Sequence, residues 1–79
     1  MTFDKWLDTL IEEKDIDLES TFEIETPDMW HLIPYGCIVE AMKATSANEQ
    51  ASIKTMLVKI DFANGDIKHY MRHLAQALI

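Results

Sequence analysis

The sequence predicts a mainly α-helical, compact single domain spanning 1–79, with about four short helices and one short extended acidic segment. One observation is the capping pattern Ser46-Ala-Asn-Glu49, which is typical of a helix N-terminus. Another is length, because 79 residues are enough for one domain and no more. The clearest observation is a C-terminal stripe at the spacing of one helix face, formed by Ile67, Tyr70, Met71, Leu74 and Leu78.

The first helix is predicted over residues 3–14. Thr2 precedes it as a cap, and the carboxylate of Asp4 suits the positive end of the helix dipole. Its apolar face repeats every three or four residues, through Phe3, Trp6, Leu7, Leu10 and Ile11.

Residues 16–25 form the extended acidic segment, because Ile16, Leu18, Phe22 and Ile24 alternate with polar residues. We expect at most one short strand there, or an extended segment held by Phe22 and Ile24. A small hairpin around residues 20–21 is the alternative.

Residues 26–32 are predicted to form a loop, since Pro27 disfavours helix just before it. Two interpretations of its apolar residues stay open. The favoured one is that Trp30 folds back onto the core as a lid. The other is that Met29 and Trp30 are exposed and anchor a partner.

A second helix is predicted over 34–44, with Pro34 as its first residue and Cys37 as a buried thiol on its apolar side. The third is predicted over 47–62. The alternative is an α+β fold with a small strand pairing near 16–25 and 57–62, because residues 58–62 alternate and Asn64-Gly65 is a preferred hairpin turn.

The fourth helix is predicted over 66–78, with Gly65 at positive φ before it and Asp66 as its cap. These four helices predict a core that includes Trp6, Leu10, Ile38, Met42, Leu57, Ile60, Tyr70, Leu74 and Leu78.

The net charge of −7 is concentrated in the first third of the chain. Up to Asp28 there are ten carboxylates and two lysines, a balance of −8, and the remainder carries +1. This field disfavours direct binding to nucleic acid or to an anionic membrane and favours a protein partner with a basic surface.

No catalytic residue, metal site or cofactor is predicted, so the chain is not expected to be an enzyme. The serines lack elbow glycines, and only two glycines are present to form a phosphate loop. His69 and His73 have metal-ligand spacing but lack further ligands, so we interpret them as solvated. The acidic run from Asp15 departs from a calcium loop, with Ser20 where glycine is required.

We expect a cytoplasmic protein. One cysteine forms no disulfide framework, the first residues do not resemble a signal peptide, and no stretch approaches a membrane span.

In a short acidic chain, two stretches resemble small accessory proteins of phages, prophages and plasmids: the opening Met-Thr-Phe-Asp-Lys-Trp-Leu-Asp-Thr-Leu-Ile-Glu-Glu-Lys and the later Leu57-Val-Lys-Ile-Asp-Phe-Ala-Asn-Gly-Asp66. The resemblance is one of general kind and carries no catalytic residue across. Several proteins of that class inhibit host defence nucleases or CRISPR complexes, and some are acidic DNA mimics. The resemblance therefore implies a mobile-element inhibitor.

The leading hypothesis is a non-enzymatic acidic binding protein, in the form of an inhibitor or DNA mimic that docks on a basic nucleic-acid-binding host protein such as a defence complex. The alternative is a small homo-oligomeric structural or assembly protein with no nucleic-acid-related partner. A third interpretation is that the acids only keep the chain soluble. The predicted partner-binding residues are Asp4, Asp8, Glu12, Asp15, Asp17, Glu19, Glu23, Glu25 and Trp30.

Overall fold

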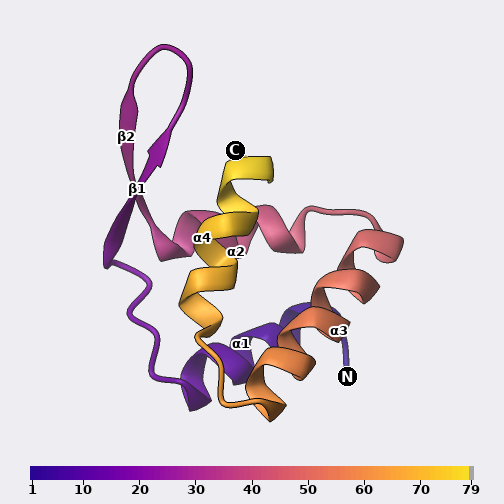
Figure 1. Cartoon of the computed structure of the whole chain (residues 1–79). Coiled ribbons are helices and arrows are strands. Elements are labelled where there is room, and N and C mark those ends of the chain that lie inside the picture. The colour runs from indigo at the N-terminus through magenta and orange to yellow at the C-terminus, as the bar shows by residue number, and fades with distance from the viewer. Residues whose placement is uncertain (79) are drawn as a thin grey trace.

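The computed structural model describes residues 1–78 and confirms a mainly helical fold with a small antiparallel sheet (Figure 1). The helices pack against one another, and the hairpin extends beyond them (Figure 1). In chain order the elements are α1 (Phe3–Glu13), β1 (Thr21–Glu25), β2 (Trp30–Pro34), α2 (Tyr35–Lys43), α3 (Ala47–Phe62) and α4 (Ile67–Leu78).

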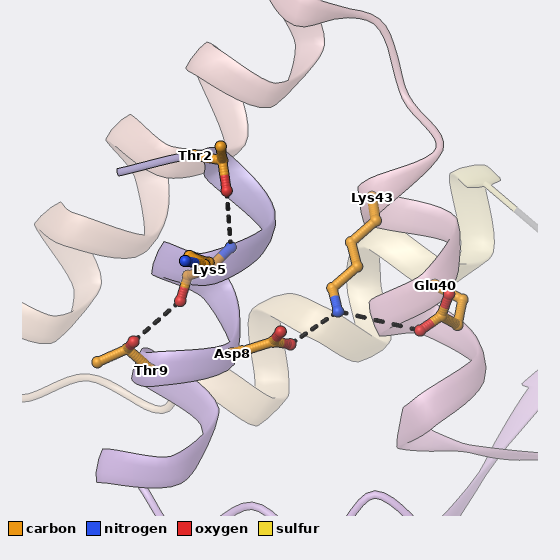
Figure 2. A network of polar contacts seen from close by, with 6 residues as sticks. All are labelled: Thr2, Lys5, Asp8, Thr9, Glu40 and Lys43. Atoms are coloured by element: carbon orange, nitrogen blue, oxygen red, sulfur yellow. Dashed lines mark hydrogen bonds and ion pairs between the residues drawn. The ribbon is translucent and has the colours of Figure 1, made fainter.

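Helix α1 begins and ends with local hydrogen bonds that its sequence supplies. The backbone N–H of Lys5 donates to Thr2 Oγ1 over 3.2 Å, which confirms the predicted cap (Figure 2). After the helix, Asp15 adopts a positive φ of 52°, and the N–H of Ile16 donates to the carbonyl of Ile11 over 3.1 Å. This is a Schellman ending, in which the two isoleucines on either side of the turn are both buried.

The strands β1 and β2 form one hairpin, in the register that pairs Glu23 with Leu32 and Glu25 with Trp30. The turn is closed by the N–H of Thr26, which donates to the carbonyl of Met29 over 2.9 Å. The predicted loop over 26–32 is therefore wrong beyond residue 29, and a hairpin around residues 20–21 is wrong as well. Pro27 begins the turn but does not prevent the chain from becoming extended again at Trp30.

Helix α2 begins at Tyr35, with Pro34 as its N-cap residue rather than its first helical residue. Its buried side chains are Tyr35, Ile38, Val39 and Met42. Cys37 is exposed, so the prediction of a buried thiol is wrong. The neighbours of Cys37 are apolar, but the helical turn directs it away from the side that packs on the core.

Helix α3 is continuous to Phe62, so a strand over 57–62 is wrong. The N–H of Glu49 donates to Ser46 Oγ over 3.3 Å, as the capping pattern predicts. Asn64, not Gly65, adopts the positive φ, at 55°, and the N–H of Gly65 donates to the carbonyl of Ile60 over 2.8 Å. The pair Asn64-Gly65 therefore ends a helix instead of turning a hairpin.

One core joins the helices and the inner face of the hairpin. Of the predicted core residues, Leu10, Ile38, Met42 and Leu57 are buried. The other five are only partly buried and pack at the margin of the core: Trp6, Ile60, Tyr70, Leu74 and Leu78. On α4 the buried residues are Ile67, Met71 and Ala75, so the helix packs with a narrower stripe than its apolar pattern predicts.

Helix α4 lies against α2, α3 and β1, which places the C-terminal part of the chain at the centre of the packing. None of the helices among residues 1–78 combines the length and apolar character that crossing a bilayer requires.

Candidate interaction surface

Asp8 of α1 lies beside a lysine of α2. Lys43 Nζ is 2.7 Å from Asp8 Oδ1 and 4.0 Å from Glu40 Oε1 (Figure 2). The hydrogen bond that Lys43 Nζ donates to Asp8 raises the pKa of Lys43. Asp4 and Glu12 are exposed on the same helix, one turn before and one turn after Asp8, so the cation of Lys43 offsets part of the negative charge between them.

Between α1 and β1, two of the predicted acids have local structural contacts. Asp15 holds the left-handed position that ends α1. Asp17 Oδ1 accepts the N–H of Glu19 over 3.0 Å, a local turn contact. The carboxylates of Asp15, Asp17 and Glu19 are all exposed, and that of Asp17 stabilises the turn.

The outer face of the hairpin combines acids with large apolar side chains. Glu23 lies opposite Leu32 and Glu25 opposite Trp30, so these four residues share one face by the alternation of an antiparallel pair. Trp30 is 61% exposed and Leu32 is 69% exposed. We call these four residues, Glu23, Glu25, Trp30 and Leu32, the hairpin face.

The favoured interpretation of Trp30 as a lid on the core is wrong. Trp30 is on the opposite side of the hairpin from the buried Phe22, Ile24 and Ile33, because side-chain direction alternates along each strand. Met29 in the turn is also exposed, as the second interpretation expected. Leu32 was missed, although its spacing of two from Trp30 is the signal of a shared strand face.

The two edges of the hairpin differ. On the β1 side, Gln76 of α4 forms two hydrogen bonds with the backbone of Glu25: Nε2 donates to the carbonyl over 3.1 Å, and Oε1 accepts the N–H over 3.2 Å. This amide takes the place of a neighbouring strand and attaches β1 to α4. The β2 edge lies on the opposite side, away from this contact.

A second group of exposed apolar residues lies on and near α3. Phe62 is 90% exposed and Val58 is 50% exposed, one helical turn apart. Met1 borders the same hollow as Val58, next to Trp6. No acidic residue of the predicted partner-binding set is on α3.

The histidine pair of α4 has the predicted spacing, with ring centroids 5.4 Å apart. Within residues 1–78, no three histidine, cysteine or acidic side chains come together in a group suited to a metal ion.

The predicted partner-binding residues thus fall into three groups: α1, the turn after it, and the hairpin face. The hairpin face combines two carboxylates with the side chains of Trp30 and Leu32, which are 61% and 69% exposed. Comparison with known proteins finds no matching family model, no matching curated protein and no matching solved structure.

Proposed function

We propose that this chain is a non-enzymatic, cytoplasmic binding protein that docks on a basic surface of a nucleic-acid-binding protein and thereby inhibits it. The observation that carries the proposal is the hairpin face, where Glu23 and Glu25 lie directly opposite Leu32 and Trp30. An inhibitor of this kind also agrees with the resemblance to small proteins of mobile elements.

The two kinds of side chain have complementary roles in binding. Buried aromatic and aliphatic anchors supply most of the affinity of a typical interface, and tryptophan is enriched among them. Carboxylates around such anchors accelerate association with a basic partner and select against acidic ones. An acidic face that served solubility alone would not require an exposed Trp30 and Leu32.

The test is capture of the partner by the tagged chain from a bacterial lysate, followed by identification and competition with duplex DNA. We expect a nucleic-acid-binding protein that is retained at low salt, released at high salt and displaced by DNA. The double variant Glu23→Lys/Glu25→Lys should lose at least tenfold in affinity for it. The matched control Glu13→Lys/Glu40→Lys makes the same change in net charge away from the hairpin and should lose much less.

Equal losses in the two double variants would show that only net charge matters, and the hairpin face would be rejected as the site. Capture of partners without basic surfaces, insensitive to salt, would reject the proposal as a whole.

A second candidate function is self-assembly, favoured by the exposure of Phe62 and Val58 on α3. In a domain this small, pairing such residues across a two-fold axis would add apolar burial that the monomer lacks. Light scattering over a range of concentrations tests it. A dimer that Phe62→Ser converts to monomer would support it, and a monomer at every concentration would reject it.

A further inference from the structure

The backbone of β2 presents unpaired groups at its outer edge. In an antiparallel pair, backbone groups point alternately toward the partner strand and away from it. The N–H and C=O of Glu25 point away from β2, toward Gln76. By alternation from the pair Glu25 and Trp30, the N–H and C=O of Trp30 and Leu32 point away from β1.

These outward groups have no partner within residues 1–78, whereas the corresponding groups of Glu25 are bonded to Gln76. Pro34 ends the strand and has no N–H, as is common on edge strands. The accessible part of the edge is therefore a short segment from Trp30 to Leu32. Its side chains are those of the hairpin face.

We propose that the outer edge of β2 accepts an extended, basic segment of a partner protein as a third strand. This inference rests on the proposed function and specifies how the partner is bound. Main-chain hydrogen bonds to Trp30 and Leu32 would supply the pairing, and the side chains of the hairpin face would select the sequence that pairs.

The chemistry of the hairpin face determines which residues the added strand would carry. Adjacent strands lie about 4.8 Å apart. A lysine or arginine on the third strand would therefore be next to Trp30 on β2, and β2 would separate it from β1. Its cation would lie over the indole ring, a favourable arrangement. A side chain of that length also reaches across β2 to the carboxylates of Glu23 and Glu25.

The charge of the chain argues against a second copy as the occupant of this edge. Pairing β2 with β2 of another copy would join two chains that each carry a net charge of −7. Like charges placed across an interface oppose association. A basic segment gains from the same charges, so the edge fits it better.

The test uses a synthetic peptide of about seven residues that alternates lysine and valine, the length of an ordinary strand. Two matched peptides accompany it: one with the same residues but every backbone nitrogen methylated, and one with glutamate in place of lysine. Binding to the full chain is followed by NMR, together with the hydrogen exchange of individual amides.

We expect the lysine peptide to bind and to slow exchange at the N–H groups of Trp30 and Leu32 by at least tenfold. The methylated peptide should bind at least tenfold more weakly, because it retains the charge but cannot donate to the edge. The glutamate peptide should not bind. Equal binding of the lysine and methylated peptides, with shifts at Glu23 and Glu25 alone, would overturn strand addition but leave charge-based docking intact.

Two variants distinguish hydrogen bonding by the backbone of β2 from contacts made by its side chains. Leu32→Pro removes an N–H that points outward and should lower affinity for the lysine peptide at least tenfold. Leu32→Thr keeps that N–H and should lower affinity less. Circular dichroism tests whether each variant is folded. If Leu32→Pro is unfolded, the test relies on Leu32→Thr and on the methylated peptide.

Absence of any binding by the lysine peptide would overturn the inference, whereas the proposed function would fall only if capture also returned no basic partner. Slow exchange at Trp30 and Leu32 in the free chain, accompanied by dimers in analytical ultracentrifugation, would assign the edge to a second copy instead.

Discussion

The side-chain amide of Gln76 forms hydrogen bonds with both backbone groups of Glu25, a residue 51 positions earlier in the chain. Both partners lie at the surface. The contact attaches β1 to α4 and closes one edge of a two-stranded sheet, which alone would be marginally stable. It also leaves β2 as the open edge.

Replacing Gln76 with leucine should destabilise the chain by about 1 kcal/mol, because both backbone groups of Glu25 lose their partner. Exchange at the N–H of Glu25 should accelerate more than exchange at Ile24, whose position alternates toward β2. Lys68→Leu, an exposed change on the same helix, is the control. Equal exchange rates at Glu25 before and after the change would contradict a structural role for the contact.

Asn64→Gly should stabilise the chain by up to about 1 kcal/mol, because Asn64 holds a positive φ that glycine adopts without strain. The same substitution at Asn48, inside α3, should destabilise it by a few tenths of a kcal/mol, at roughly the difference in helix propensity. Urea denaturation of both variants gives the two free energies. A destabilised Asn64→Gly would mean that its side chain has a role beyond backbone geometry.

Gly65→Ala should destabilise the chain by about 1–3 kcal/mol, as overpacking does. An added Cβ would lie 2.9 Å from Ile60 Cγ2 and 3.3 Å from the carbonyl oxygen of Ile60. The carbonyl is fixed by its bond to the Gly65 N–H, so the strain cannot be relieved by a side-chain rotation alone. Thermal unfolding measures the effect, and an unchanged midpoint would contradict the close approach.

Leu57→Ala should lower the free energy of unfolding by about 2–5 kcal/mol. Val58→Ala should lower it by less than about 0.5 kcal/mol, apart from the difference in helix propensity between valine and alanine. Leu57 is 1% exposed, and its neighbour Val58 is 50% exposed. Denaturant unfolding compares the two directly. Similar losses for both would indicate that Val58 is covered, for example in a dimer, and would favour self-assembly.

The ion pair between Lys43 and Asp8 should contribute to the pH dependence of stability at alkaline pH. Because the pKa of Lys43 is raised above 10.5 in the folded chain, its stabilisation is complete below about pH 10.5 and is lost as pH rises through the folded value. Asp8→Asn should lower stability at pH 9 by less than about 1 kcal/mol, as for other exposed pairs.

The two chains should then converge in stability as Lys43 deprotonates. Burial also raises the pKa of Tyr70, which steepens the alkaline loss in both chains and therefore cancels in the comparison. A difference that stays constant up to the highest pH measured would show that Lys43 does not contribute through its charge.

Local patterns in the sequence were sufficient to predict the helices, since periodicity and caps act over a few residues. The caps at Thr2 and Ser46 and the four helices agree with the structure within about a turn. The hairpin was less predictable, because a strand is stabilised by pairing with another strand, and local sequence patterns do not indicate which segment that is. Residues 58–62 also alternate, yet they continue a helix whose stability comes from packing.

The sequence by itself determined the helical class and the concentration of acids in the first third of the chain. These follow from composition and from the spacing of apolar residues, and neither depends on distant contacts. Only the tertiary structure decided which acids keep their charge unopposed and which apolar residues stay exposed. Lys43 reaches Asp8 across 35 residues, and the pairing of β1 with β2 turns Trp30 outward beside Glu25. Both outcomes depend on how separate elements pack, and that packing selects among faces that look equivalent in the linear sequence.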